Sequence, residues 1–406
     1  AVSSLSCWTQ ALAKTDLDVL GAKPAETLDK SVKVVNTYHE IHCHGQCMLK
    51  AHVKNGRLLA LTSAGDVPRC EAAKTDESIG KMQRRACMKG YAERKRLYAP
   101  DRLKYPLLQT IERGNLAGFK RISWDEAIDR ACEHIEKARA RQKELGYIPI
   151  WEVGSTPLAF LGPYVSCWGH HSAGNEMDAL FNALGKGVNG HPSIDMLNSK
   201  FIIVWGADPQ TTSPHLPFIM TKAREKGIPI VVVDPRYTGT VGAMATGAKG
   251  ITPWIAPRPG TDSAILAAMA NTIYRRGLHD EAYIRKYCFG FFPDDTVVSH
   301  SPAKDPITGK PWKGTTFTTP KGQSFVEYLD ELNREHGGEE GVLRWASLLS
   351  GVQAETIEAL AVTYAKTKPA CLHSTWTCGG AQRTGNGMYH VWLLLCLAAM
   401  TGNATV

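Results

Sequence analysis

The sequence contains no apolar run long enough to cross a lipid bilayer. The longest run, residues 391–400, has about half of the roughly 20 residues that a spanning helix needs, so we expect it to be the buried core of a helix. Cysteine is also scarce, because 11 residues in a chain of 406 are too few for a disulfide scaffold. The net charge is only +8 and the Lys and Arg residues are mostly dispersed, which gives nucleic-acid binding little support.

The composition is that of an ordinary globular protein of two or three domains. Hydrophobic residues make up 43% and charged residues 21% of a chain that is longer than one hydrophobic core usually organises. The sequence begins at Ala1 without a methionine, which suits a mature N-terminus after removal of an export signal and equally a sequence that starts late. It stops at Val406 directly after an expected helix. We therefore expect the natural protein to continue and this chain to be its N-terminal portion.

The first third of the chain has the pattern of a small β unit. Residues 48–53 and 57–61 form two runs that flank Asn55-Gly56, and Asn-Gly between such runs is the strongest short-range signal for a hairpin. A further run, residues 32–36, precedes them.

The rest of the chain alternates between helical patterns and short apolar runs. A helix is expected from Ser123, where Ser123 and Glu126 have the spacing of a capping box, to about Gly146, and another over residues 263–276. Apolar strands between such helices predict a parallel sheet. The expected strands are residues 148–153, 201–205, 228–233 and 370–375. The expected fold class is therefore α/β, with a small N-terminal β-rich domain followed by domains with parallel, Rossmann-like sheets.

Four residues near the N-terminus have the spacing of a metal centre. His39, Cys43 and Cys47 lie close together, and Cys87 follows forty residues later. Thiolate ligands favour iron-sulfur clusters or zinc. Zinc sites usually pair their ligands as two close couples, so three close ligands and one distant ligand fit a 4Fe-4S cluster better. A histidine in place of a thiolate removes one negative ligand charge and should raise the reduction potential of the cluster.

Two other histidines compete with His39 for the fourth position. His42 and His44 flank Cys43 directly, where strand geometry would point them away from it, so His39 is the preferred ligand. Two alternatives to the cluster remain: a structural zinc site, or no shared metal centre, in which case these four residues are unrelated to one another.

Several short motifs follow along the chain, starting at the last of these four residues. They are Cys87-x-Lys89-Gly90, Pro100-Asp101-Arg102-Leu103, Ile122-Ser123-Trp124-Asp125-Glu126-Ala127, Asn198-Ser199-Lys200, Val233-Asp234-Pro235-Arg236, Pro257-Arg258-Pro259-Gly260-Thr261-Asp262 and Gly379-Gly380-Ala381-Gln382-Arg383. Each is weak alone. Together with the metal ligands they resemble the N-terminal half of the catalytic subunit in the dimethyl sulfoxide reductase family of molybdopterin oxidoreductases. The resemblance covers about residues 35–290 and resumes at 379–383.

The resemblance implies molybdenum, or tungsten, held by bis-molybdopterin guanine dinucleotide, and one 4Fe-4S cluster. Ligands bind at the carboxyl ends of parallel strands, so the turns after the expected strands should line one crevice. Asp234 could accept ribose or guanine donors, while the helix that opens at Gly260-Thr261-Asp262 could hold a pyrophosphate and pair Asp262 with guanine. Plain turn and capping chemistry is the alternative for each motif alone. The expected cofactor-binding residues are Trp205, Gly206, Ala207, Asp208, Asp234, Pro235, Arg236, Pro259, Gly260, Thr261, Asp262, Gly379, Gln382 and Arg383.

The resemblance places the protein ligand of the metal in the loop 166–176. The position that matches the serine of the reductase branch is Ser172, and a serine alkoxide is a hard oxygen donor suited to high-valent molybdenum. Cys167 is the alternative ligand. His170 and His171 border Ser172 and could donate protons to a leaving oxygen, or be ordinary loop histidines.

Two further residues near the proposed cluster bear on its role, Lys89 and His39. Lys89 follows the last cluster ligand and lies between cluster and pterin in related proteins, where its charge can tune both, although an exposed lysine is the plain alternative. His39 resembles a nitrate-reductase-like branch whose metal ligand is an aspartate, so its pairing with Ser172 mixes two branches.

The expected activity is reduction of a small oxygenated substrate by oxygen-atom or hydroxyl removal at the metal, with electrons delivered through the cluster. A phenolic dehydroxylase or hydroxytransferase of the same family is one alternative, and a non-catalytic electron-transfer or scaffold subunit is another. Expected partners are the small-molecule substrate, a ferredoxin-like multi-cluster iron-sulfur subunit and a membrane anchor, without nucleic acid. The resemblance implies anaerobic respiration on the periplasmic, extracytoplasmic side after export, with a cytoplasmic location as the alternative.

The expected domains follow the motifs. They are an N-terminal arm with the cluster domain (1–105), the first part of an α/β domain (106–175), a Rossmann-like dinucleotide-binding domain (176–368) and a return to the first α/β domain (369–406).

Overall fold

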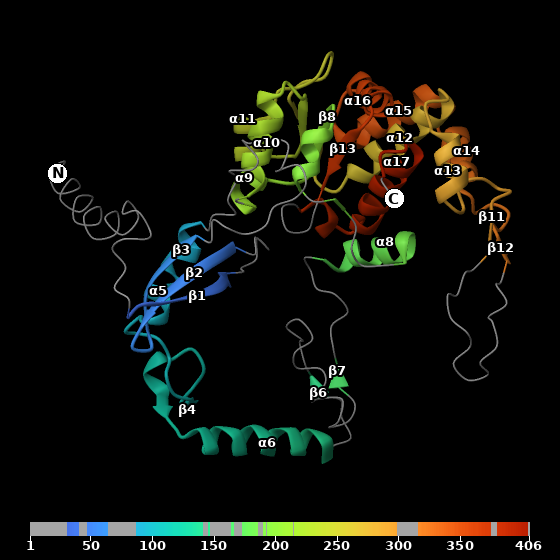
Figure 1. The fold of residues 1–406 in the computed structure, drawn as a ribbon. Coiled ribbons are helices and arrows are strands. Elements are labelled where there is room, and N and C mark those ends of the chain that lie inside the picture. The colour runs from blue at the N-terminus through green and yellow to red at the C-terminus, as the bar shows by residue number, and fades with distance from the viewer. Residues whose placement is uncertain are drawn as a thin grey trace, which may run out of the picture. The chain divides into compact units, whose positions relative to one another are not determined.

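The computed structural model describes most of the chain, and it divides into two units, Ala1–Lys104 and Tyr105–Val406 (Figure 1). The described residues are 31–39, 47–63, 87–140, 145–146, 164–165, 173–185, 190–191, 193–213, 215–298, 316–374 and 380–404. Within them no helix combines the length and the apolar character that a membrane crossing requires.

The first unit is a three-stranded antiparallel sheet with one helix. Its strands lie in the order β1-β2-β3, and α5 packs beside β3. The elements are β1 (Lys33–His39), β2 (Cys47–Lys54), β3 (Arg57–Ser63) and α5 (Met88–Leu97). Asn55 and Gly56, with φ of 48° and 73°, make the turn of the predicted hairpin. Tyr91 of α5 packs against Cys47 and Leu49, and its hydroxyl lies 2.5 Å from Ser63 Oγ, which fixes the helix to the sheet.

The second unit carries the remaining elements. They are β4 (Leu107–Gln109), β5 (Phe119–Arg121), α6 (Trp124–Ala140), β6 (Leu145–Gly146), β7 (Tyr164–Val165), α8 (Gly174–Leu184), β8 (Phe201–Trp205), α9 (Pro209–Thr212), α10 (Leu216–Glu225), β9 (Ile230–Val233), α11 (Gly239–Met244), β10 (Trp254–Ile255), α12 (Asp262–Arg275), α13 (Glu281–Tyr287), β11 (Thr296–Val298), β12 (Thr316–Thr318), α14 (Phe325–Glu335), α15 (Glu339–Ser350), α16 (Ala354–Lys366), β13 (Ala370–His373) and α17 (Gly387–Met400).

A four-stranded parallel sheet organises this unit, with the strand order β10-β9-β8-β13. Followed along the chain, the strands are added outward from β8 through β9 to β10, whereas the last strand, β13, is added on the other side of β8. The direction of strand addition therefore reverses at β8. In open α/β sheets ligands bind at the carboxyl edge beside such a reversal.

Helices cover both faces of the sheet. Phe201, Ile203 and Trp205 of β8 share a buried core with α12, α15, α16 and α17. Ile202 and Val204 are buried on the opposite face, on the side where Figure 1 shows α10 and α11. Strands buried on both faces are continuous apolar runs, and this is why the sequence pattern predicted them correctly.

The expected elements are largely confirmed. The predicted strands 201–205, 228–233 and 370–375 correspond to β8, β9 and β13, and the run 391–400 lies in the buried helix α17. The predicted strand 148–153 lies outside the described residues. The α/β fold class, with a small antiparallel sheet followed by a parallel one, is confirmed.

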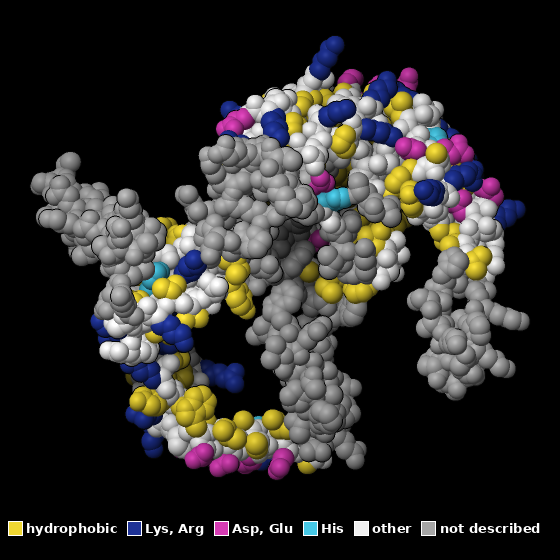
Figure 2. Space-filling view, viewed as in Figure 1, with side chains coloured by type: hydrophobic (Ala, Val, Ile, Leu, Met, Phe, Trp, Pro, Cys, Tyr) yellow, Lys and Arg dark blue, Asp and Glu magenta, His cyan; other side chains and the backbone are white. Residues whose placement is uncertain are grey.

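Helix α6 begins as predicted, because Ser123 Oγ accepts the backbone N–H of Glu126 at 3.0 Å. Figure 2 shows hydrophobic side chains along one side of this helix and acidic side chains along the other. Trp124 and Ile128 are 65% and 55% exposed, so its apolar side is uncovered in the described part of the chain.

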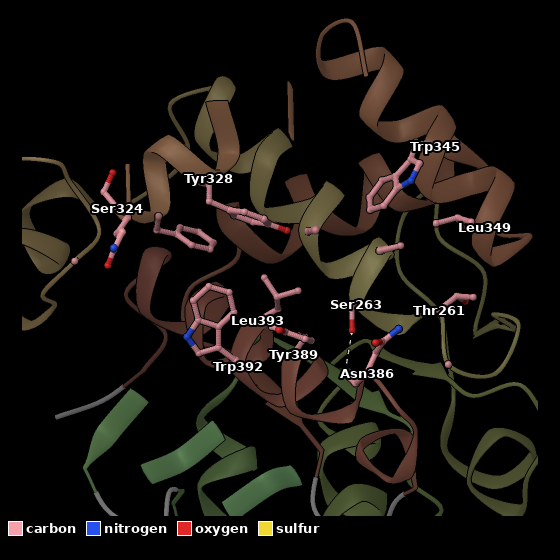
Figure 3. A pocket seen from close by; sticks show the side chains of 16 residues that line it. Thr261, Ser263, Ser324, Tyr328, Trp345, Leu349, Asn386, Tyr389, Trp392 and Leu393 are labelled. Carbon is pink, nitrogen blue, oxygen red and sulfur yellow. Dashed lines mark hydrogen bonds between the residues drawn. The ribbon is translucent and has the colours of Figure 1, made fainter. Parts of the chain in front are cut away.

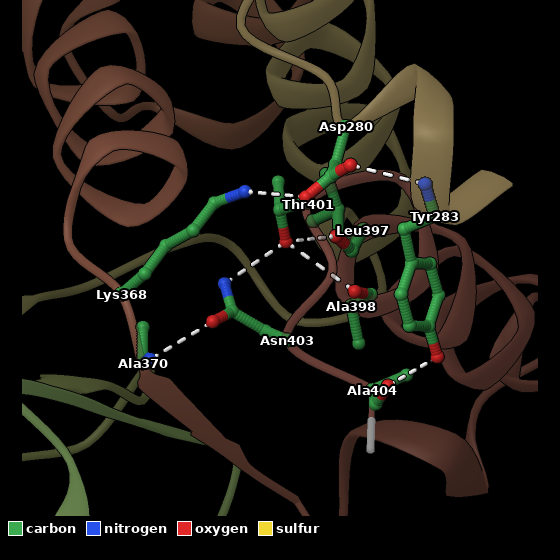
Figure 4. A network of polar contacts seen from close by, with 9 residues as sticks. All are labelled: Asp280, Tyr283, Lys368, Ala370, Leu397, Ala398, Thr401, Asn403 and Ala404. Carbon is green, nitrogen blue, oxygen red and sulfur yellow. Dashed lines mark hydrogen bonds and ion pairs between the residues drawn. The ribbon is translucent and has the colours of Figure 1, made fainter. Parts of the chain in front are cut away.

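Polar contacts tie the end of α17 to the start of β13 (Figure 4). Asn403 Oδ1 accepts the backbone N–H of Ala370 at 2.9 Å. Asp280 accepts from Lys368 Nζ and from the backbone N–H of Tyr283, both at 3.0 Å. The bonds of Ala370 and Lys368 hold the start of the outer strand β13 against the loop after α17 and against Asp280.

Candidate functional site

The carboxyl ends of the four parallel strands bring the predicted nucleotide-binding turns together. The N–H of Gly206 donates to Val233 O at 2.7 Å, and the N–H of Asp234 donates to Ile255 O at 3.0 Å. On the other side of β8, the N–H of Gly380 donates to Gly206 O at 2.8 Å. The turns after β8, β9, β10 and β13 therefore start from one edge of the sheet.

Gly206 allows the backbone to turn sharply at this edge. Its φ is +58°, and a Cβ added there would lie 2.7 Å from Ala381 Cβ. Both facts favour glycine, because other residues rarely adopt positive φ and cannot approach a neighbour so closely. The turn after β8 is thus packed directly against the turn after β13.

Trp205 and Asp262 join the end of β8 to the start of α12. Trp205 Nε1 donates to Asp262 Oδ1 at 2.8 Å, and both side chains are buried. The ring of His390 lies 6.1 Å from that of Trp205. Burial lowers the pKa of His390 to about 4, although the carboxylate of Asp262 opposes this shift, so His390 is neutral at pH 7.

Asp208 is held by the neighbouring helix α11. Its Oδ1 accepts the backbone N–H of Thr240 at 3.0 Å and the Thr240 hydroxyl at 2.7 Å. Burial alone would raise the pKa of Asp208, but these hydrogen bonds and the charge of Arg236 outweigh it, and the pKa lies below its ordinary value. Asp208 therefore stays ionised and stabilises the edge.

Asp234 has a different environment. Burial raises the pKa of its carboxyl. A hydrogen bond from the N–H of Arg236 at 2.9 Å and the charge of Arg236 oppose this shift, and the charges of Asp208 and Asp262 add to it. A half-buried carboxylate with carboxylate neighbours is stabilised by donors that a ligand brings. Asp234 is thus the acidic residue of this edge best suited to accept ligand N–H or O–H groups.

Three buried polar atoms close to this edge lack a hydrogen-bond partner among the described residues, Gln382 Nε2, His390 Nδ1 and His373 Nε2 at the end of β13. Buried polar groups are almost always paired, so such atoms indicate a missing polar partner. The backbone around Gln382 is itself fixed, because Asn175 Nδ2 donates to the carbonyls of Gln382 and Thr384 at 2.9 and 3.0 Å. The edge therefore fits a large ligand rich in donors and acceptors, as a pterin dinucleotide is.

The other residues of the predicted cofactor set vary in exposure. Ala207 is buried, Gly260 and Thr261 are partly buried, and Pro235, Arg236, Pro259 and Arg383 are exposed. Gly379 lies outside the described residues.

In the first unit, His39 and Cys47 lie directly opposite each other on β1 and β2. Opposed residues of an antiparallel pair have Cα atoms about 4.5–5.5 Å apart, so both side chains can reach one metal cluster. His39 Nδ1 lies 3.7 Å from the carboxylate of Glu93, while its buried Nε2 lacks a partner among the described residues. Cys87 is the half-buried residue at the N-terminus of α5. Metal-ligating histidines usually direct their second ring nitrogen toward a carboxylate, a carbonyl or water, and the position of Glu93 beside Nδ1 fits that pattern.

The remaining predicted residues are less constrained by the structure. Lys89 is exposed on α5. Outside the described residues lie Cys43, Cys167, His170, His171 and Ser172, so their roles stay predictions. Without Cys43, the described residues contain no group of three His, Cys, Asp or Glu side chains arranged for a metal ion.

Sequence reasoning missed Glu93, Thr240 and His390. Glu93 contacts His39 across 54 positions and Thr240 contacts Asp208 across 32 positions, so no local pattern connects either pair. His390 precedes the apolar run of α17, and a polar residue beside such a run was the available sign of a buried polar contact.

Comparison with known proteins agrees with this geometry. A sequence model described as molybdopterin oxidoreductase matches residues 102–406. Dimethyl sulfoxide reductase DmsA of Escherichia coli is 29% identical, over 98% of this chain and 47% of its own length. The alpha subunit of perchlorate reductase from Dechloromonas aromatica is 30% identical over 60% of this chain and 26% of its own length.

A solved structure shows the same fold. Acetylene hydratase from Pelobacter acetylenicus superimposes with a TM-score of 0.60 at 20% identity, covering 88% of this chain and 42% of that protein. The chain spans about half the length of the dimethyl sulfoxide reductases that it matches. The match over residues 102–406 and the similarity to these reductases confirm the predicted resemblance: the chain belongs to the molybdopterin oxidoreductase family.

Proposed function

We propose that the chain is the cofactor-binding N-terminal part of the catalytic subunit of a molybdenum or tungsten oxidoreductase. The enzyme would reduce a small oxygenated substrate by removing an oxygen atom or hydroxyl at the metal. The observation that carries the proposal is the carboxyl edge beside β8, where the pKa of the half-buried Asp234 is raised and the buried Gln382 Nε2 and His390 Nδ1 have no hydrogen-bond partner among the described residues.

The proposed ligand at this edge is bis-molybdopterin guanine dinucleotide. Asp234 would accept ribose or guanine donors, and the backbone N–H groups at the start of α12 would face a pyrophosphate. Asp262 uses one carboxylate oxygen for Trp205, which leaves the other for guanine. When bound, the metal of this cofactor supplies a site for the substrate oxygen and changes its oxidation state by two.

The proposed 4Fe-4S cluster has His39, Cys43, Cys47 and Cys87 as ligands. His39 would bind iron through Nε2, because Glu93 occupies its Nδ1 side. Structural zinc would be less consistent with a single distant fourth ligand. Lys89, exposed two residues beyond Cys87, is proposed to tune the potential of cluster and pterin through its charge.

Ser172 is the proposed protein ligand of the metal, with Cys167 as the alternative. His171, and less directly His170, would hold the proton that a leaving oxygen needs. The names of the relatives support reductive removal of oxygen, since dimethyl sulfoxide, nitrate and perchlorate reductases are among them.

The enzyme would require an external electron source. Relatives named as alpha subunits indicate assemblies of several subunits. We propose a ferredoxin-like iron-sulfur subunit as electron donor, a membrane anchor as third component, and a periplasmic location in anaerobic respiration.

Metal and cofactor analysis of the full-length protein, purified without oxygen, tests this proposal. Mass spectrometry should find molybdenum or tungsten together with iron, and acid release should yield a pterin and guanine nucleotide. Iron without molybdenum, tungsten or pterin would instead support a non-catalytic electron-transfer subunit. In the same preparation, His39→Ala should change the electron paramagnetic resonance spectrum of the cluster, and an unchanged spectrum would exclude His39 as a ligand.

A further inference from the structure

A pocket with aromatic walls lies between four helices of the second unit (Figure 3). Its volume is about 680 Å³, within the range of roughly 300–1,000 Å³ that small-molecule sites occupy. Tyr328 of α14 and Trp345 of α15 form one wall, and Tyr389 and Trp392 of α17 form the opposite wall. The helix α12 contributes Ser263, Ala264 and Ala267.

The residues of α12 that line the pocket differ from the one that bonds to the end of β8. On α12, Asp262 bonds to Trp205, whereas Ser263, Ala264 and Ala267 line the pocket. At about 100° per residue, Ala264 and Ala267 lie roughly 140–160° around the helix from Asp262, and Ser263 lies about 100° from it. Gly260 and Thr261, which are expected cofactor-binding residues, also line the pocket, so the pocket adjoins the proposed cofactor site at this loop.

The walls of the pocket leave aromatic surface in contact with water. Tyr389 is 53% exposed, Tyr328 is 37% exposed, and Leu349 at the rim is 45% exposed. Trp392 lies edge-on to Phe325 with ring centroids 5.7 Å apart, and the ring of His336 stacks on Trp345 at 4.7 Å. Because packing already orients these indole rings, a planar ligand could stack between the walls with little loss of side-chain entropy.

The polar groups of the pocket are uncharged. None of the 16 described residues that line it is Asp, Glu, Lys, Arg or His. Ser263 Oγ and Asn386 lie side by side at one end, joined by a long hydrogen bond of 3.4 Å from Ser263 Oγ to Asn386 O. Burial raises the pKa of Tyr328, so its hydroxyl remains a neutral donor. An ionised ligand would lose hydration without gaining an ion pair here.

We propose that this pocket binds an uncharged planar aromatic molecule with one hydrogen-bonding group, such as a phenol. The ring stacks between the α14–α15 wall and the α17 wall, and the polar group reaches Ser263 and Asn386. The proposal goes beyond the proposed redox activity and does not rest on it.

Equilibrium dialysis of the full-length protein with 2-naphthol tests the proposal. We expect saturable binding, and binding of 2-naphthoate, which has the same ring system but a charge, at least about tenfold weaker. Absence of saturable 2-naphthol binding up to millimolar concentration, or equal affinity for both compounds, would overturn the proposal.

Matched variants locate the site. Tyr389→Ala should weaken 2-naphthol binding about tenfold, since it removes one stacking ring, and Leu349→Ala several-fold. Two controls lie outside the pocket. Leu348 is the adjacent leucine of α15, and Tyr287 of α13 has nearly the same exposed fraction as Tyr389. Leu348→Ala and Tyr287→Ala should therefore leave 2-naphthol binding unchanged. Unchanged affinity in both Leu349→Ala and Tyr389→Ala would reject the pocket as the site. Pterin content should stay constant in all four variants, which separates this test from that of the proposed cofactor.

Discussion

Trp205 at the end of β8 and Asp262 at the start of α12 form a buried hydrogen bond of 2.8 Å across 57 positions of the chain. The bond fixes the orientation of a carboxylate at the sheet edge where the nucleotide is proposed to bind. Asp262 is only 6% exposed and Trp205 is fully buried, so water cannot replace the indole donor easily. Strand, helix and proposed ligand contact therefore depend on one side-chain pair.

Trp205→Phe should destabilise the protein, because it leaves Asp262 Oδ1 without its donor. An unsatisfied buried acceptor costs about 1–3 kcal/mol, and the smaller ring adds a cavity. Urea denaturation of the full-length protein measures the loss. Trp124→Phe is the control, since Trp124 is 65% exposed and its replacement should change the free energy of unfolding by less than about 0.5 kcal/mol. Equal stability of the two variants would contradict the role of this bond.

Asp234→Asn should keep or increase stability at neutral pH while lowering pterin content. The pKa of Asp234 is raised in the folded protein by burial first and by its carboxylate neighbours next. Its stabilising contribution is therefore complete below the unfolded pKa of about 4 and is lost as pH rises through the folded pKa. Asparagine carries no such penalty and retains an oxygen for the N–H of Arg236. Denaturation between pH 4 and 8 should show the advantage of the variant growing with pH, and the opposite trend would refute the environment described for Asp234.

His390 should make the protein sensitive to acid. Burial lowers its pKa from 6.5 to about 4, so its stabilising contribution is present above pH 6.5 and is lost as pH falls toward 4. The shift corresponds to about 3 kcal/mol. His390→Gln should flatten the pH dependence of the free energy of unfolding over this interval, whatever its effect on absolute stability. His134→Gln, at an exposed position of α6, should retain the wild-type slope.

Gly206→Ala should be more costly than Gly227→Ala. Both glycines have positive φ, +58° and +75°, so both variants carry backbone strain of about 1 kcal/mol. Gly227 has no atom within 4 Å of an added Cβ, whereas at Gly206 that atom would meet Ala381 Cβ at 2.7 Å. The difference in unfolding free energy between the variants thus isolates the contact between the turns after β8 and β13. If both variants lose the same stability, the two turns are not in close contact.

The sequence predicted the local features of the fold better than its long-range contacts. β8 was found with its observed ends because a strand buried on both faces is a continuous apolar run. The turn at Asn55 and Gly56 followed from backbone preferences alone. By contrast, the bond between Asp208 and Thr240 depends on the packing of α11 against the strand ends, which no periodicity records.

The candidate site shows the same division. Residues in recurring motifs, such as Asp234 and Asp262, could be assigned to the sheet edge because the carboxyl ends of parallel strands meet there. His390 could not, since its contact with Trp205 joins a helix to a strand far away in the sequence. The aromatic pocket was not predicted for the same reason, because its walls come from different helices.

Glu93→Gln should weaken the proposed cluster without unfolding the first unit. Glu93 lies 3.7 Å from His39 Nδ1, and an uncharged amide would no longer favour the tautomer that leaves Nε2 as the ligand. Loss of such an outer partner typically lowers metal affinity about 10–100-fold. Iron content after dialysis against a chelator should fall faster than in the wild type, and the spectrum of the remaining cluster should shift. Glu126→Gln is the control, since within the described residues the carboxylate of Glu126 pairs with Arg130 on the surface of α6. Iron loss at the same rate in both variants would show that Glu93 does not support the ligand.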